Sequence, residues 1–379
     1  MKLGFYEAVA TLIGTTVGAG ILGIPYVVAK SGFAAGMLHI LIIGAVMILL
    51  KLYMGEVVLR TKKIHQMTGY AERYLGRDGK NWMVGTMIFG VYCALIAYTI
   101  GVGHSLNAIF PSLSPFFFSM VFFAVASTII YRGLKAVKDS ELLLTSLVVL
   151  IAGAIIAIAL FSDKFSGANM STFSYPFMLV PFGTVLFAFM GSTAVPEMKL
   201  ELGRNAKKLK KAIVIGGLIP IAVYALFALA VVGTSSGTVS EVATISLSEV
   251  FGGSMAVLAN LFAVLAMGTS FIALGLALRD MYIYDYKMHE TEAWVLTCLF
   301  PLATFVFGIN SFIAVIGIAG AISGGLQSII IVMMHKAAKT RGERKPEYSL
   351  RYSTVIGMTI IGIFIAGMIY QIATSFSVS

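Results

Sequence analysis

The first hydrophobic segment contains, at its centre, the stretch Gly14-Thr15-Thr16-Val17-Gly18-Ala19-Gly20-Ile21-Leu22-Gly23-Ile24-Pro25. A helix that crosses a membrane satisfies its backbone hydrogen bonds internally, because lipid offers no partners. Four glycines and a proline weaken this helix where an ordinary span is rich in leucine and isoleucine. Such a break is tolerated where it is buried in protein and can hold a substrate or an ion. The stretch therefore indicates a transporter.

The composition is that of a membrane protein. The 379 residues are 59% hydrophobic and only 12% charged, whereas soluble domains carry roughly a quarter charged residues. We therefore expect one all-α, polytopic membrane domain over residues 1–379, with no signal peptide ahead of it. Helices of about 20 residues cross the hydrocarbon core, and we expect eleven. Their expected limits are 5–30, 34–59, 82–110, 116–131, 141–161, 177–200, 211–233, 253–279, 291–309, 311–335 and 352–372.

The net charge of +10 is distributed in a way that orients the chain. Lysine and arginine gather in alternate loops, which is the positive-inside pattern. It predicts a plasma-membrane protein with its N-terminus inside and its C-terminus outside, and it argues against a nucleic-acid partner. The two cysteines, Cys93 and Cys298, lie inside expected spans and have neither disulfide nor metal spacing.

A second interrupted segment lies half-way along the chain, at Phe187-Ala188-Phe189-Met190-Gly191-Ser192-Thr193-Ala194-Val195-Pro196-Glu197. A glycine and a proline are five residues apart here, as Gly20 and Pro25 are in the first segment. Interrupted segments at matching places indicate an inverted-repeat transporter. We expect repeats over about 5–161 and 177–335, discontinuous helices 1 and 6, and an extra helix over about 352–372. The alternative is that these glycines only let helices pack closely.

Three motifs together resemble the amino acid/auxin permease family of the amino acid–polyamine–organocation superfamily, which shares the fold of the bacterial leucine transporter. They are the stretch from Gly14 to Pro25, the run from Pro196 to Leu202 with the basic residues after it, and Thr269 to Leu276 followed by Arg279-Asp280. The third resembles helix 8 of the aromatic amino acid permeases. One departure is that many relatives carry a histidine near the break of helix 6, where this chain has Met190-Gly191-Ser192.

An amino acid zwitterion needs donors for its carboxylate and acceptors for its ammonium group. Backbone N–H groups at the first break can supply the donors, and freed carbonyls of both breaks can supply the acceptors. No Asp or Glu lies in the middle of helices 1, 3, 6 or 8, so we expect a neutral, hydrophobic or aromatic substrate. Tyr98 is a further candidate for the pocket wall. The substrate-binding candidates are Thr15, Thr16, Gly18, Ala19, Gly20, Ile21, Tyr92, Phe187, Phe189, Met190 and Ser192. Packing is the alternative role for the aromatic residues, and bonding to its own helix is the alternative for Ser192.

A coupling ion is expected between helices 1 and 8. Ala266, Thr269 and Ser270 project to one face of a helix, and two hydroxyls with carbonyls of a broken helix suit a small hard cation. The family resemblance implies a sodium cage of the Gly14, Val17 and Ala266 carbonyls with the Thr269 and Ser270 hydroxyls. The alternative is that these hydroxyls bond within the helix bundle.

Proton coupling and uncoupled exchange are alternative modes. The fifth span has no ionisable residue from Leu142 to Phe161, which weakens proton coupling. Other intramembrane ionisable residues are proton carriers by default. They are Glu7, His39, Lys51, Glu56, His104, Glu197 and Glu201, and we single out Glu7, His104 and Glu197 as proton or gating candidates.

Other function classes fit less well. His289-Glu290-Thr291-Glu292 lacks the second histidine of a zinc enzyme motif, so no enzyme activity and no cofactor other than the coupling ion are expected. A channel does not need paired helix breaks. A transporter-like amino acid sensor is the remaining alternative class, although no signalling segment is evident. The expected partners are an amino acid and the lipid bilayer.

Overall fold

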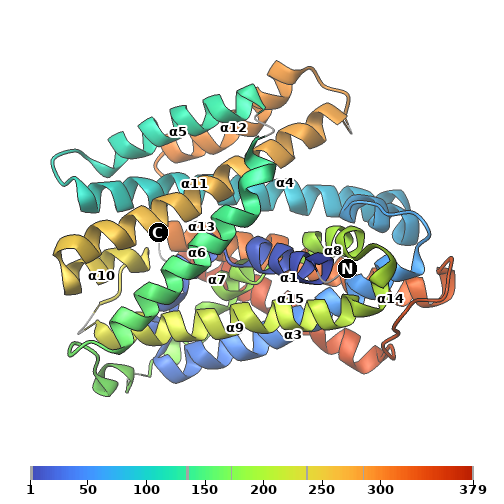
Figure 1. The fold of residues 1–379 in the computed structure, drawn as a ribbon, viewed down its shortest axis with the longest axis horizontal. Coiled ribbons are helices and arrows are strands. Elements are labelled where there is room, and N and C mark those ends of the chain that lie inside the picture. Colours follow the sequence, from blue (N-terminus) through green and yellow to red (C-terminus); the bar gives the residue numbers. More distant parts are fainter. Residues whose placement is uncertain (1–2, 134–135, 172, 236–237, 285, 378–379) are drawn as a thin grey trace.

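The computed structural model describes residues 3–133, 136–171, 173–235, 238–284 and 286–377 (Figure 1). In these ranges the chain is almost entirely helical, and one isolated bridge joins Gly32 to Phe173. The expected loop from Arg132 to Lys138 lies partly outside the described residues. The α-helices are α1 Leu3–Thr16, α2 Ile24–Ser31, α3 Phe33–Arg60, α4 Met67–Ile109, α5 Pro115–Arg132, α6 Ala136–Leu160, α7 Pro181–Ala188, α8 Val195–Leu202, α9 Leu209–Thr234, α10 Ala243–Phe251, α11 Gly253–Tyr284, α12 Glu290–Val306, α13 Phe312–Ala319, α14 Gly325–Arg341 and α15 Thr354–Ser377.

The expected all-α membrane architecture is confirmed. Among the described residues, seven helical stretches are long and apolar enough to cross a membrane, or eight if the bent α1–α2 pair is one span. The eleven spans stay a prediction, because α12 and the apolar part of α6 from 146 to 160 are shorter than 18 residues. One counted stretch, 181–234, contains both α7–α8 and α9.

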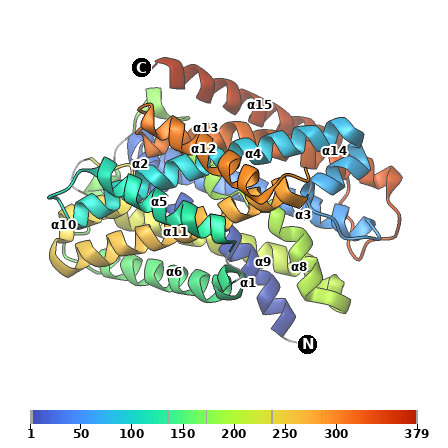
Figure 2. The same ribbon diagram turned by 90° about the horizontal axis from the view of Figure 1, so that it is seen from above.

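The helices form two groups that pack side by side. One group is built on α4, which contacts α5, α11 and α12, and it forms the upper part of Figure 1. The other group contains α1, α3, α7, α8 and α9, and therefore both interrupted segments. α13 and α14 lie between them, because α13 packs on both α4 and α7, and α14 on both α3 and α4. Figure 2 shows the two chain ends in opposite halves of the molecule along its long axis.

Local sequence signals explain several helix limits. Gly76 adopts φ +78 within α4 and separates a short first part, which lies in an expected loop, from the long apolar part. His289 caps α12 through its side chain, and Glu292 bonds back to the cap N–H. The His289–Glu292 motif therefore forms a capping box rather than a catalytic centre.

A buried carboxylate joins the end of α3 to α14 and the segment before α15. Glu56 is fully buried. It accepts hydrogen bonds from Arg60 at 2.8 Å, His335 at 3.0 Å, Lys339, the Ser349 hydroxyl and the Leu350 N–H. Cationic donors offset the cost of burying this charge, so Glu56 ties the end of α3 to a C-terminal region that is 279 or more residues away in the sequence.

Candidate functional site at two helix breaks

The first interrupted segment is a true break. α1 ends at Thr16, a short 3₁₀ turn follows over Ala19–Gly23, and the two halves are bent by 45°. The N–H of Gly18 donates to the Thr16 carbonyl at 3.1 Å, and that of Ile21 donates to Gly18 at 3.3 Å. In a continuous α-helix these two N–H groups would bond the carbonyls four residues earlier, which belong to Gly14 and Val17. Both of those carbonyls are therefore released from helical bonding.

The break also leaves two buried backbone donors available. Among the described residues, the N–H groups of Ala19 and Gly20 have no acceptor, although both residues are buried. Gly18 and Ile21, by contrast, already use their N–H groups within the turn. Of the four expected carboxylate donors, the structure thus leaves Ala19 and Gly20 free. Buried N–H groups without a partner at the start of a helical turn are suited to an anion.

The second interrupted segment is broken in the same way. α7 ends at Ala188, and a short turn over Ser192–Ala194 leads into α8. Gly191 lies between them with φ +148, which only glycine adopts without strain. A side chain on Gly191 would also begin 2.8 Å from the Thr16 hydroxyl, so the two breaks face each other there. The expectation of discontinuous helices 1 and 6 is confirmed.

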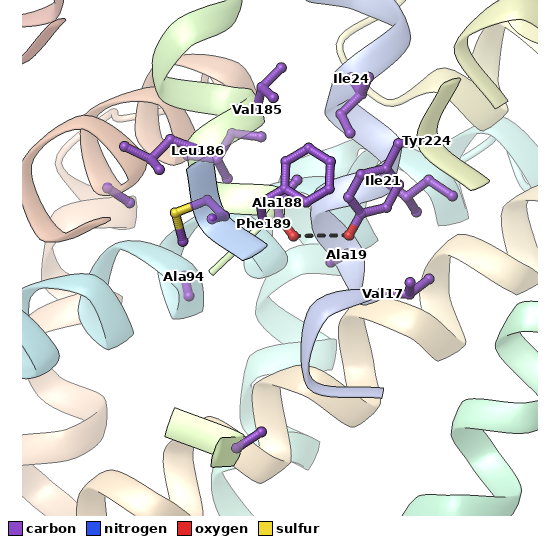
Figure 3. Packing of buried hydrophobic residues seen from close by; sticks show 14 of the residues in the cluster. Val17, Ala19, Ile21, Ile24, Ala94, Val185, Leu186, Ala188, Phe189 and Tyr224 are labelled. Carbon is purple, nitrogen blue, oxygen red and sulfur yellow. Dashed lines mark hydrogen bonds between the residues drawn. The ribbon is translucent and has the colours of Figure 1, made fainter. Parts of the chain in front are cut away.

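The breaks are in direct contact. A Cβ on Gly20 would lie 2.7 Å from the Cα of Ala188. The hydroxyl of Tyr224, on α9, donates to the carbonyls of Thr16 at 2.6 Å and Ala188 at 2.9 Å. Figure 3 shows this side chain beside Phe189, with its hydroxyl directed at the Ala188 carbonyl. One buried tyrosine thus serves the last carbonyls of both α1 and α7.

A buried lysine serves the next carbonyl of the second break. Lys51, on α3, is 1% exposed, and its Nζ donates to the Phe189 carbonyl at 3.0 Å. The amine therefore lies at the C-terminal end of α7, where the helix dipole favours positive charge. The sequence marks Lys51 only as an ionisable residue within a span. Nothing in the sequence marks Tyr224, because its role depends on contacts with two distant helices.

Two hydroxyls at the breaks are buried without a hydrogen-bond partner. They are Thr16 Oγ1 and Ser192 Oγ. A buried hydroxyl that makes no bond costs roughly 1–3 kcal/mol, so these atoms are suited to a ligand. Thr15 differs, since it is exposed and donates to the Thr11 carbonyl of its own helix at 2.8 Å.

The candidate wall residues separate into three kinds. Phe187 and Met190 are half-buried and lie against the π-turn Gly320–Gly324 between α13 and α14. Phe189 and Tyr98 are buried, and the Phe189 ring packs on that of Tyr224 with centroids 4.9 Å apart. Tyr92 is not brought to the breaks. Its hydroxyl bonds with Tyr282 and the Leu296 carbonyl, and its ring packs on Phe300 of α12.

The residues of the expected cation cage lie at the first break and on α11. α11 packs beside the first break, where Ser270 Oγ lies 3.3 Å from the Cβ position of Gly18. Ala266 is buried, and Thr269 and Ser270 are half-buried. The Thr269 hydroxyl donates within its own helix, to Leu265 at 2.8 Å and Ala266 at 3.3 Å. Its oxygen lone pairs remain able to accept or to coordinate.

The proton and gating candidates lie on three different helices, α1, α8 and α4. Glu7 lines a cavity of about 480 Å³ together with Glu201, Arg204 and Lys208. Glu197 is exposed on α8, and His104 is exposed near the end of α4. In the described part of the chain, no group of three His, Cys, Asp or Glu residues could hold a metal ion.

Comparisons with known proteins agree with this architecture. The structure of MhsT in complex with L-phenylalanine superposes with a TM-score of 0.67 at 15% identity, covering 99% of this chain and 98% of that one. Glutamine transporter 2 of Aliivibrio fischeri is 24% identical over 368 residues, which are 94% of this chain and 95% of that protein. Tyrosine-specific transport system 1 of Haemophilus influenzae is 22% identical over 388 residues and 96% of both proteins.

The fold is that of an integral membrane protein, and the relatives are named as transporters rather than enzymes. The model of the tryptophan/tyrosine permease family matches residues 1–374. The chain belongs to this family, which is a family of amino acid transporters. The resemblance to aromatic amino acid permeases and to the leucine-transporter fold is thereby confirmed.

Proposed function

We propose that this protein is a secondary active transporter of neutral L-amino acids, with hydrophobic or aromatic side chains preferred. The observation that carries the proposal is the pair of facing breaks, with the free N–H groups of Ala19 and Gly20 beside the unpaired hydroxyls of Thr16 and Ser192. The N–H groups suit a carboxylate, and the hydroxyls can accept from an ammonium group. The names of relatives that transport tyrosine and glutamine, and the phenylalanine bound to MhsT, agree with a neutral substrate.

The character of the surrounding wall supports the same substrate class. Phe187 and Met190 are half-buried beside the second break and offer apolar contacts to a side chain. The two interrupted stretches, 14–25 and 187–197, contain one acidic residue, Glu197, and its side chain is exposed. A cationic substrate side chain in this low-dielectric region would lack a counter-charge. We propose the membrane orientation that the sequence predicts, with the N-terminus inside and the C-terminus outside. We also propose the predicted repeats over about 5–161 and 177–335, and membership of the amino acid/auxin permeases.

We propose sodium as the coupling ion, held by the carbonyls of Gly14, Val17 and Ala266 and the hydroxyls of Thr269 and Ser270. Two observations support the cage. The break releases the carbonyls of Gly14 and Val17 from helical bonds, and Ser270 lies against Gly18. Five oxygen atoms without a carboxylate suit a monovalent hard cation better than a divalent one.

The first test is thermal stabilisation of the purified protein by each of the twenty amino acids, with and without sodium, at two pH values. A ligand that binds the folded state raises the unfolding temperature. Stabilisation by neutral amino acids that grows with sodium is expected. Stabilisation that depends on pH but not on sodium would favour proton coupling, and no response to any amino acid would refute the proposed function.

The second test addresses the cage. Replacing both Thr269 and Ser270 by Ala removes two of the five oxygen ligands, so the sodium dependence of substrate binding is expected to disappear. Thr304→Ala is the matched control, because Thr304 on α12 also bonds back to its own helix, at 2.8 Å. Unchanged sodium dependence in the double variant would refute the cage.

A further inference from the structure

Lys51 is placed unusually for a charged side chain. It lies within α3, is 1% exposed and reaches the second break. An ammonium group has three donors, yet the polar contact of Nζ among the described residues is one carbonyl, that of Phe189. In the described part of the chain no carboxylate oxygen lies within 4.0 Å of Nζ.

The other ionisable groups that pack around α3 are engaged elsewhere. From α14, His335 and Lys339 bond to Glu56, which lies five residues further along α3. From α9, the Tyr224 hydroxyl bonds to Thr16 and Ala188. The Tyr348 hydroxyl, from the segment before α15, donates to the Leu52 carbonyl at 2.7 Å.

The remaining neighbours bring no counter-charge either. From α2, Lys30 is exposed and contacts Tyr26 at 3.4 Å. From α8, Glu197 is exposed, Lys199 donates to the Gly203 carbonyl, and Glu201 accepts from the Thr11 hydroxyl. The residues of α7 and of the turn 192–194 include no ionisable side chain. Among the described residues around α3, Lys51 is therefore the cationic side chain that reaches a break, and the group near its charge there is the end of α7.

A buried ammonium without a counter-ion loses its proton readily when another positive charge approaches, because like charges and burial both disfavour the charged form. A bound amino acid zwitterion has no net charge, because its carboxylate offsets its ammonium group, so the coupling cation is what adds a net positive charge at the facing breaks. Gly191 lies between the first break and Lys51. A Cβ atom built on this glycine would lie 2.8 Å from Thr16 Oγ1 and 3.7 Å from Lys51 Cε. The first break and the lysine side chain are thus separated by a single backbone segment.

We propose that Lys51 is protonated when the site is empty and releases its proton to solvent when the amino acid and its coupling cation bind. The N–H bond breaks, the nitrogen keeps the electron pair, and water accepts the proton. The proton returns when the substrate leaves. This inference rests on the proposed function, and it makes protons antagonists of substrate binding at the helix breaks.

The test measures the affinity of the purified full-length protein for L-phenylalanine, L-tyrosine, L-tryptophan and L-glutamine between pH 5.5 and 9 at saturating sodium. Wild-type affinity is expected to rise with pH, by up to tenfold per pH unit where Lys51 titrates in the empty protein. Calorimetry in two buffers of different ionisation enthalpy is expected to show about one proton released per bound amino acid.

Two substitutions of Lys51 separate a titrating role from a packing role. Lys51→Met has no proton to release, so its affinity is expected to be independent of pH and to match the wild type at high pH. Lys51→Arg stays charged, so its affinity is expected to be independent of pH and to match the wild type at low pH. Lys199→Met is the matched control, because Lys199 also donates to a backbone carbonyl, at 3.2 Å, but is not buried. It is expected to keep the wild-type pH dependence.

The outcomes are distinct. A Lys51→Met protein that binds substrate with the wild-type pH slope, or a wild type that binds without proton release, refutes the role of Lys51 and leaves the proposed function intact. Loss of binding in both Lys51 variants, with their unfolding temperatures lowered alike, means that the lysine has a structural role and also refutes the inference. If no amino acid binds to the wild type, the proposed function itself fails, and the inference fails with it.

Discussion

Replacing Tyr224 by Phe tests whether one hydroxyl holds the two breaks together. The hydroxyl donates to the Thr16 carbonyl at 2.6 Å and the Ala188 carbonyl at 2.9 Å, and all three residues are buried. One proton can serve only one of these carbonyls at a time, so the substitution removes the equivalent of one hydrogen bond and leaves a buried acceptor unpaired. This costs about 1–3 kcal/mol of stability. The ring is retained, so its contact with Phe189 adds no cavity cost.

The measurement is the free energy of unfolding of purified protein, followed by affinity for the amino acid that stabilises the wild type best. Affinity is expected to fall as well, by about tenfold for each 1.4 kcal/mol that the bond contributes to the bound arrangement of the breaks. Tyr26→Phe is the control. Among the described residues its hydroxyl accepts a bond from Lys30 alone, at 3.4 Å and exposed to solvent, so we expect a change within about 0.5 kcal/mol. If Tyr224→Phe matches this control in stability and affinity, the hydroxyl does not organise the site.

Three further substitutions test other parts of the structure. Gly20→Ala places a methyl group 2.7 Å from the backbone of α7 and is expected to abolish amino acid binding and cost about 1–3 kcal/mol. Gly268→Ala is the control, because its methyl group would lie 3.6 Å from the Phe122 ring, and this variant is expected to bind the amino acid normally. Equal binding by both variants would contradict the close contact between Gly20 and α7. Glu56→Gln removes the buried negative charge that pairs with the partly buried Arg60 and Lys339 and is expected to lower the unfolding free energy by about 3 kcal/mol, whereas Glu72→Gln in an exposed pair is expected to cost under about 1 kcal/mol. Equal losses in chemical denaturation would contradict the buried cluster. Gly76→Ala forces a side chain into the backbone conformation φ +78, ψ −168, which is essentially restricted to glycine, and is expected to cost about 1–3 kcal/mol, so an unchanged or raised melting temperature would contradict that conformation.

The sequence predicts the helix breaks well because their cause is local. Each break contains glycine and is followed within a few residues by a proline. Both residue types weaken helical hydrogen bonding whatever the surrounding tertiary structure is. The structure has the breaks at these positions. The carbonyl side of the proposed cage follows from the same local effect, since a lost i to i−4 bond releases the carbonyls of Gly14 and Val17.

Predictions for single side chains succeed less evenly. Ser270 does face the first break, because helical spacing fixes which residues share a face. Tyr92 contacts α12 instead of the breaks, since the rotation of α4 about its axis depends on its neighbours. His289 and Glu292 cap a helix, although the same letters suggest a fragment of a metal motif.

The sequence by itself determined the membrane character, the all-helical fold and the two interruptions, because hydropathy, glycine and proline act over a few residues. Only the tertiary structure decided which groups meet at the breaks. Tyr224 comes from α9 and Lys51 from α3, and they lie 208 and 138 residues from the carbonyls of Thr16 and Phe189 that they bond. A buried donor is identified by the acceptor it reaches, and packing of distant helices sets that distance.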